Sequence, residues 1–162
     1  MNVTILDSIF ELGLRAMLIL LHQAPHPMSL ERIIYFDYYS SYNIDLLSNA
    51  DGIVVLPPYP YRTAELYNKH QKMQEALRFY ASKNLISINC DDTGISYAAN
   101  PNTHWMFQTL KQTSFAQKYS VALSKCANVL QHMSEEEIRL HGFSLIQTPH
   151  DQPYLYYEEE EE

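Results

Sequence analysis

One stretch of this 162-residue sequence changes from helical periodicity to alternation, and it constrains the fold more than any other feature. On both sides of the segment Asp91-Asp92-Thr93-Gly94, apolar side chains alternate with serine or asparagine. The alternating residues are Ile86, Ser87, Ile88, Asn89 and Cys90 before the segment and Ile95, Ser96 and Tyr97 after it. Alternation around a glycine-containing turn predicts a β-hairpin. Because the flanking patterns are helical, we expect a mainly α protein with one small hairpin.

Three helices are predicted before the hairpin. Ser8 and Glu11 form a capping-box pattern for a helix ending near His22, and Ser29 is a suitable N-cap for a second helix over residues 30–40. A third helix begins near residue 62 and ends near residue 83, because its apolar face repeats at helical spacing. The residues of this face are Leu66, His70, Met73, Leu77 and Tyr80. Two helices, a long helix and a hairpin follow one another in the order of a winged helix.

Two more helices are predicted after the hairpin. Asn100 followed by Pro101 is a strong start signal for a helix to about residue 112. The side chains expected to face inward from it are Trp105, Met106 and Leu110. Ser114 is expected to cap another helix, whose apolar stripe consists of Phe115, Tyr119, Leu123, Cys126, Leu130 and Met133. We therefore expect a winged-helix-like domain with C-terminal helices over residues 1–133, followed by an acidic, flexible tail over residues 134–162.

The net charge of −8 resides in that tail. Residues 134–162 contain nine acidic residues and one basic residue, so the preceding body is neutral. Neutralisation of phosphates dominates nucleic-acid affinity, and a neutral body therefore argues against strong DNA binding by the free chain. A local basic face remains compatible with this balance.

The sequence offers little catalytic or metal-binding chemistry. Its four glycines form no phosphate-binding loop, and its seven histidines have no ligand spacing. Cys90 is expected to be a core residue on the inner face of the hairpin, and Asp91-Asp92 are expected to serve the turn. We therefore predict no enzyme activity, no cofactor and no metal. A small enzyme stays the weakest of three alternatives.

The cellular setting is predicted from two features. The two cysteines, Cys90 and Cys126, are too few for a disulfide framework and fit a reduced, cytoplasmic location. The most apolar run covers residues 16–21 and is too short to span a bilayer, so no membrane association is expected.

Tyrosines and prolines point to a binding surface. The sequence contains thirteen tyrosines, and tyrosine suits protein interfaces because its ring can be buried while its hydroxyl stays hydrogen-bonded. Residues 57–61 form a rigid, proline-rich entry to the third helix, where Arg62 and Glu65 occupy the first turn. Arg62 could pair with Glu65 or Asp37 as an internal brace, or contact a partner. The candidate partner-binding residues are Tyr38, Tyr39, Tyr59, Tyr61, Arg62 and Glu65.

Four strings in this order resemble one known family. They are FELGLRAMLILL at residues 10–21, SLERIIYFDYY at 29–39, PYPYRTAEL at 58–66 and TGISYAA at 93–99. Over about residues 8–130 the chain resembles the middle component, or small subunit, of ABC-three-component systems, as found in Lamassu-type operons that defend bacteria against phages and plasmids. The resemblance implies a non-catalytic accessory subunit. Its partners would be an SMC-like coiled-coil ATPase subunit and a nuclease-type effector, and it would contact DNA only through the complex.

The main alternative is a free winged-helix transcriptional regulator that binds DNA. The third helix would then lie in the major groove and direct basic side chains to the phosphates. The candidate DNA-backbone residues are Lys69, Lys72, Arg78 and Lys83.

Overall fold

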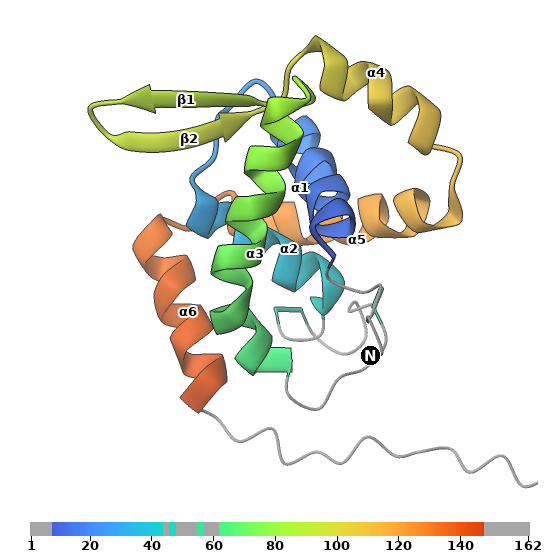
Figure 1. Cartoon of the computed structure of the whole chain (residues 1–162). Helices are drawn as coiled ribbons and strands as arrows, with labels where there is room; N and C mark the ends of the chain where they lie inside the picture. Colours follow the sequence, from blue (N-terminus) through green and yellow to red (C-terminus); the bar gives the residue numbers. More distant parts are fainter. Residues whose placement is uncertain (1–7, 44–45, 48–54, 57–61, 148–162) are drawn as a thin grey trace, which may run out of the picture.

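The computed structural model describes residues 8–43, 46–47, 55–56 and 62–147 (Figure 1). Within this part the chain is mainly α-helical and contains one antiparallel hairpin, as predicted. The elements in order are α1 (Ile9–Gln23), α2 (Leu30–Ser41), α3 (Arg62–Ser82), β1 (Ser87–Asp91), β2 (Gly94–Ala98), α4 (Pro101–Leu110), α5 (Ser114–Leu130) and α6 (Glu135–Gln147).

Local capping chemistry fixes most helix starts. The Ser8 hydroxyl accepts a hydrogen bond from the amide of Glu11, and the Ser29 hydroxyl accepts one from the amide of Arg32. Asn100 caps α4, with Pro101 as its first residue, as predicted. The cap of α5 is Thr113 rather than Ser114, a shift of one residue from the prediction.

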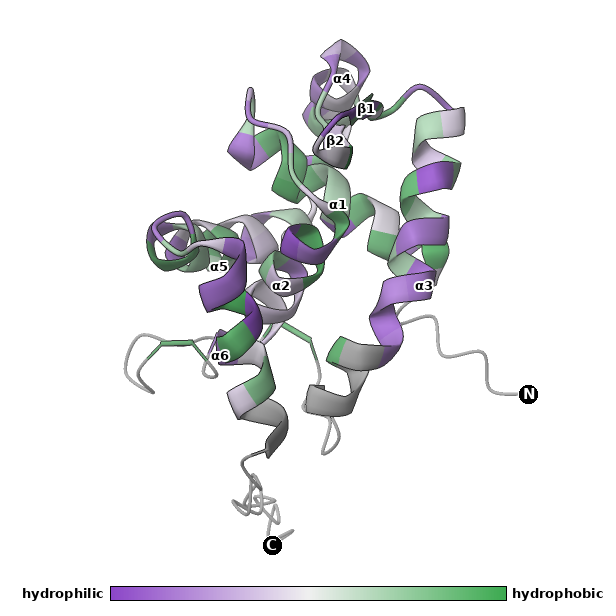
Figure 2. Ribbon diagram, turned by 90° about the vertical axis from the view of Figure 1, so that its left-hand side faces the viewer, coloured by the Kyte–Doolittle hydropathy of each residue, from purple (hydrophilic) through white to green (hydrophobic). Residues whose placement is uncertain are grey.

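Helix α2 lies at the centre of the molecule and packs against α1, α3 and α5 (Figures 1 and 2). Nine consecutive residues of α2, from Ile33 to Ser41, are buried. The α1–α3 crossing is close, because a methyl group added at Gly13 would overlap the ring of Tyr80. Four residues of the expected stripe of α5 are buried, namely Tyr119, Leu123, Cys126 and Leu130, whereas Phe115 is partly buried and Met133 lies after the end of the helix.

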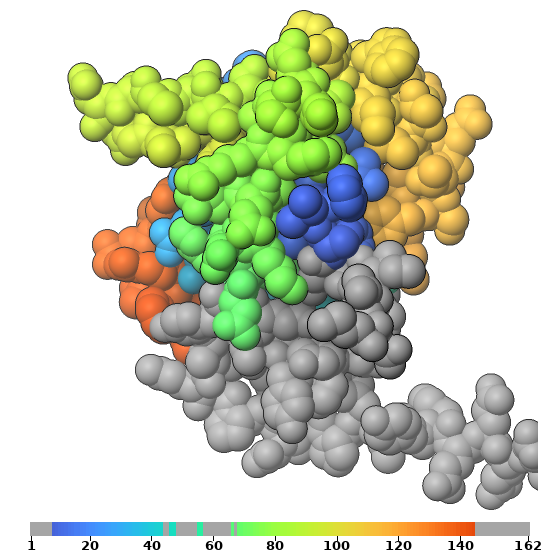
Figure 3. Space-filling model, in the orientation of Figure 1, coloured from blue at the N-terminus to red at the C-terminus, as the bar shows by residue number. Residues whose placement is uncertain are grey.

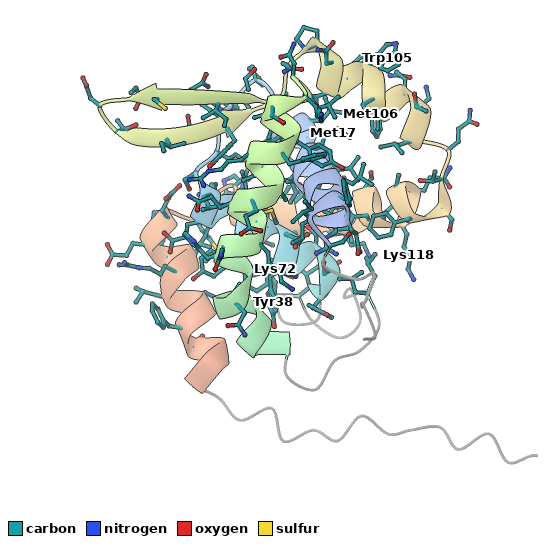
Figure 4. All side chains as sticks on the ribbon, viewed as in Figure 1. Met17, Tyr38, Lys72, Trp105, Met106 and Lys118 are labelled. Carbon is teal, nitrogen blue, oxygen red and sulfur yellow. The ribbon has the colours of Figure 1, made fainter. Side chains whose placement is uncertain are left out.

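Helix α4 lies at the edge of the fold and differs from the expectation. Trp105 is 70% exposed and lies on the outer side of the helix, so its predicted inward position is wrong (Figure 4). Met106 and Leu110 are partly buried against the core. The ten-residue helix has α1 as its main neighbour, so only one side of α4 is covered.

The hairpin extends away from the helical body (Figures 1 and 3). Its register places Ile88 opposite Tyr97 and Cys90 opposite Ile95. Tyr97 is buried at the base, whereas Cys90 is exposed, so the expected core position of Cys90 is wrong. The cause is that the distal half of the hairpin projects beyond the helices that cover its base.

Helix α6 corrects the predicted boundary at residue 134. Ile138 is 1% exposed, and a methyl group added at Gly142 would overlap the ring of Tyr35 on α2. The segment that was expected to begin the flexible tail is therefore helical and packed on α2 and α3. Residues 148–162 of that predicted tail lie outside the described part.

Candidate functional site

The most polar part of the interior is an ion cluster centred on Asp37 of α2. Arg15 of α1 donates to both carboxylate oxygens, from Nε to Oδ1 over 2.7 Å and from Nη2 to Oδ2 over 3.1 Å. The Tyr119 hydroxyl of α5 donates to Oδ1 over 2.8 Å, and Lys69 Nζ of α3 lies 3.3 Å from Oδ2. Arg15 also donates to Glu11 one turn earlier. Four helices are thus joined at one carboxylate.

The protonation states in this cluster follow from burial and charge. Burial acts to raise the pKa of Asp37, but the charges of Arg15 and Lys69 and the hydrogen bond from Tyr119 more than offset it, so this pKa lies below its ordinary value. Burial and the nearby carboxylate raise the pKa of Tyr119 well above its ordinary value. Asp37 is therefore ionised and Tyr119 protonated at neutral pH, as their hydrogen bond requires.

This cluster is an internal brace rather than a reactive site. Arg15 and Asp37 are 0% exposed, and Lys69 is 2% exposed. In the structure these groups are therefore closed off from solvent. The role of Arg15 was not anticipated from the sequence, and its signal was a charged residue inside the apolar run of the first helix.

The predicted partner-binding tyrosines of α2 are core residues. Tyr38, labelled in Figure 4, and Tyr39 are both 0% exposed. The Tyr39 hydroxyl forms a 2.5 Å hydrogen bond with Nδ1 of His141 on α6. Their expected placement on an interface is wrong for the folded chain, because neighbouring helices cover the sides of α2 that carry these two rings. The other predicted residues leave the idea untested. Tyr59 and Tyr61 lie outside the described residues, and for Arg62 and Glu65 only the backbone, in the first turn of α3, is described.

The predicted DNA-backbone residues divide into two groups. Lys69 is buried against Asp37, so its expected contact with phosphates is wrong. Lys72, Arg78 and Lys83 are exposed on α3 or just after it, and Figure 4 shows Lys72 on the outer side of the helix. Glu75 is exposed on the same helix and reduces its positive charge.

A groove of about 400 Å³ lies between α2, α3 and α6. Its apolar lining consists of Ile34, Tyr35, Leu66 and Phe143, and its charged or titratable lining consists of Glu31, His70 and Arg139. Phe143 is 41% exposed, so part of its ring remains open to solvent. Figure 2 shows α3 and α6 on opposite sides of α2, which places α2 along the floor of the groove. We name this feature the α2–α3–α6 groove; sequence reasoning missed it because α6 was expected to be tail.

The described residues contain no cluster of three or more potential metal ligands among His, Cys, Asp and Glu. Cys126 is buried, and burial raises the pKa of its thiol to about 12 despite hydrogen bonds involving Ser40 and Asn43. This thiol is therefore protonated and donates to the Tyr39 carbonyl over 3.0 Å. Within the described ranges, no helix is long and apolar enough to cross a membrane.

In the part of the chain that the structure describes, the fold is a small helical one, and its accessible features include a groove and a projecting hairpin. The family model described as ABC-three component (ABC-3C) system Middle Component 2 matches residues 5–147. The match covers most of the chain, and the chain therefore belongs to this family. Middle components are accessory subunits that work with the other components of a multi-component system. No curated protein and no solved structure matches the chain.

Proposed function

We propose that this chain is a non-catalytic accessory subunit of a Lamassu-type defence complex. In this proposal it docks on an SMC-like coiled-coil ATPase subunit and couples it to a nuclease-type effector. The supporting observation is the family match over residues 5–147, which spans every described helix and the hairpin. The proposal sets the complex in the cytoplasm, which accords with the two free cysteines.

The architecture supports a winged-helix assignment within this proposal. In a winged helix, a short extended segment between the first two helices pairs with the hairpin. Here Met28, which lies between α1 and α2, exchanges two backbone hydrogen bonds of 2.8 Å with Tyr97 of β2. The hairpin then corresponds to the wing and α3 to the third helix. This correspondence is an argument from fold, so it does not by itself imply DNA binding.

The α2–α3–α6 groove is the docking surface that we propose for the ATPase subunit. A concave, mainly apolar surface with a few charged groups at its edge is typical of binding sites. Phe143 is suited to act as an anchor because an exposed aromatic ring loses solvent contact when a partner covers it. With Tyr38 and Tyr39 in the core, this groove replaces them as the proposed contact region.

The test is co-purification of the full chain with the other components of its system. Phe143→Ala should weaken binding to the ATPase subunit by at least ~10-fold, as expected for loss of an aromatic anchor. Val121→Ala is the matched control, because Val121 is 55% exposed on α5 and does not line the groove. The wild-type complex should also survive high salt, since apolar contacts are not screened. Equal losses for the two variants would argue against the groove, and failure to bind any component would contradict the proposed function.

The non-catalytic part of the proposal has its own test. The purified chain should neither hydrolyse ATP nor cleave DNA above the level of a mock preparation. ATP hydrolysis or DNA cleavage by the purified chain above that level would contradict the non-catalytic role.

A free DNA-binding regulator remains the second candidate, favoured by the exposed side chains of Lys72, Arg78 and Lys83. Burial of Lys69 removes one of the four expected phosphate contacts. The hairpin also carries Asp91 and Asp92 at its tip, where a DNA-contacting wing would meet phosphates. Sub-micromolar binding of the free chain to duplex DNA at about 0.15 M salt would favour the regulator, since non-specific binding is much weaker at that salt.

A further inference from the structure

One face of the hairpin is apolar from its base to its tip. Cross-strand partners point to the same face of a sheet, as do residues two apart on one strand. The register therefore places four side chains on one face, namely Ile88, Cys90, Ile95 and Tyr97. Ser87, Asn89, Asp91, Ser96 and Ala98 occupy the opposite face, which is mainly polar. The hairpin is thus amphipathic, and its two faces can be tested separately.

Only the base of this apolar face is covered by the protein itself. Tyr97 is 3% exposed, and Ile86, which directly precedes β1, is 2% exposed, whereas Ile88 and Ile95 are 41% and 55% exposed. The apolar face therefore continues beyond the helical body as an exposed strip, on the same side of the hairpin as its buried base. Figure 3 shows this part of the hairpin as a projection from the body. We call the exposed part, made of Ile88, Cys90 and Ile95, the hairpin ledge.

Carboxylates form the tip of the hairpin, directly beyond the outer end of the ledge. Asp91 and Asp92 form the exposed tip, and residues 84–100 contain no basic residue. At the base, Glu135 of α6 accepts a hydrogen bond from Ser29, which is next to the Met28 that pairs with β2. The neighbouring Glu136 and Glu137 are also exposed. On the α3 side, Arg78 lies close enough to Tyr97 for its charge to act on the phenol.

We propose that the hairpin ledge docks a basic segment with an apolar face, contributed by another component of the three-component system. This inference rests on the proposed function, because it assigns a second contact to the same complex. The apolar strip supplies area to bury, and the carboxylates at the tip select lysine or arginine on the partner. DNA is disfavoured as the occupant because its phosphates would meet Asp91 and Asp92. A symmetric contact between two copies of the ledge would bring the same carboxylates together.

The experiment measures binding of the full chain to each of the other two purified components separately. Ile88→Thr together with Ile95→Thr removes apolar surface and keeps β-branched side chains, which suit a strand. The matched control, Asn89→Ala with Ser96→Ala, changes the opposite face of the same strands. Asp92→Lys reverses one tip charge and spares Asp91, whose carboxylate accepts hydrogen bonds from Thr93 that hold the turn. Melting curves of all variants confirm that the body remains folded.

One component should bind the Ile88→Thr, Ile95→Thr variant at least ~10-fold more weakly, and the control should stay within about twofold of the wild type. Asp92→Lys should weaken the same binding several-fold at low salt and less at high salt, because exposed charges are screened. Unchanged binding of the isoleucine variant would overturn the ledge while leaving the proposed function standing. Wild-type chain that binds neither component would overturn both.

Two other occupants are distinguished in the same experiment. If Asp92→Lys strengthens and the isoleucine variant weakens binding to a short duplex DNA while neither affects protein binding, the hairpin is a nucleic-acid wing. If the wild-type chain self-associates and the Ile88→Thr, Ile95→Thr variant does not, the occupant is a second copy of the chain. Its α5 would supply the basic and apolar surface, with Lys118, Val121 and Lys125 exposed. Either result would overturn the proposed partner.

Discussion

Replacing Asp37 with asparagine should destabilise the fold more than any surface substitution of a charged residue. The substitution would preserve the size of the side chain but remove the negative charge that faces Arg15 and Lys69. Both cations are almost fully buried. After the substitution, Arg15 would keep its ion pair with Glu11. Removing one partner of a buried ion pair costs about 3–5 kcal/mol, because the remaining charge stays desolvated. For a chain of this size, that corresponds to a loss of roughly 10 °C in Tm.

Urea denaturation and thermal melting of Asp37→Asn, followed by circular dichroism, provide the measurement. The matched control is Glu136→Gln, which breaks an exposed pair with Arg139 at 3.5 Å and should change the free energy of unfolding by less than ~1 kcal/mol. A triple variant with Asp37→Leu, Arg15→Met and Lys69→Met should recover much of the loss, since apolar replacement of a whole buried ion cluster is often neutral. A loss below ~1 kcal/mol for Asp37→Asn would refute the view that this cluster holds the helices together.

The same cluster predicts the direction of a pH effect. The pKa of Asp37 in the folded state lies below its ordinary value of 3.8, with burial opposed by the charges of Arg15 and Lys69 and the Tyr119 hydrogen bond. Its contribution to stability is therefore complete above the unfolded pKa and is lost as the pH falls through the folded pKa. The difference in the free energy of unfolding between the wild type and Asp37→Asn should narrow below about pH 4. A difference that stays constant down to acid unfolding would contradict this assignment.

Two further predictions concern the reactivity of the two cysteines and the packing of helix α6. Iodoacetamide should modify Cys90, which is exposed, and spare Cys126, whose thiol is buried with a pKa of about 12. Labelling of the native protein is measured by mass spectrometry, and equal labelling of the two cysteines would contradict this prediction. Ile138→Ala should cost about 2–4 kcal/mol in urea denaturation, because a fully buried isoleucine is truncated. Leu140→Ala, at a 58% exposed position of the same helix, should cost much less, and similar losses would contradict the packing of α6.

The local chemistry of the chain made much of the fold predictable. Ser29 and Asn100 cap helices where the sequence indicates, and the alternation around Gly94 gives the hairpin. Helix α6 also had a signal. The Ser134 hydroxyl accepts from the Glu137 amide, and Glu137 accepts from the Ser134 amide, so Ser-Glu-Glu-Glu is a capping box. The glutamates by their charge alone predict a solvated tail, but acidic residues also favour a helix N-terminus, which is the role they have here.

The site was less predictable because it depends on contacts distant in sequence. Asp37 and Arg15 are 22 residues apart, and Tyr119 is 82 residues from Asp37. No local pattern pairs such residues, although a charged residue within an apolar run is a hint that it is buried with a partner. The burial of Tyr38 and Tyr39 had a clearer signal. Apolar and aromatic residues lie on nearly all sides of α2, a pattern that is typical of a central helix whose tyrosines are core residues.

The position of Asp37 bears on how the chain works. A strongly perturbed pKa in a carboxylate is often taken to mark a catalytic site. Here the perturbation has a structural cause, since the carboxylate is 0% exposed and its charge is held by Arg15, Lys69 and Tyr119. The brace fixes α2 and α3, which form the floor and one wall of the α2–α3–α6 groove. An accessory subunit gains from such rigidity, because a preformed surface loses little conformational freedom when a partner binds. Breaking the brace should therefore weaken docking at the groove even where Phe143 is intact.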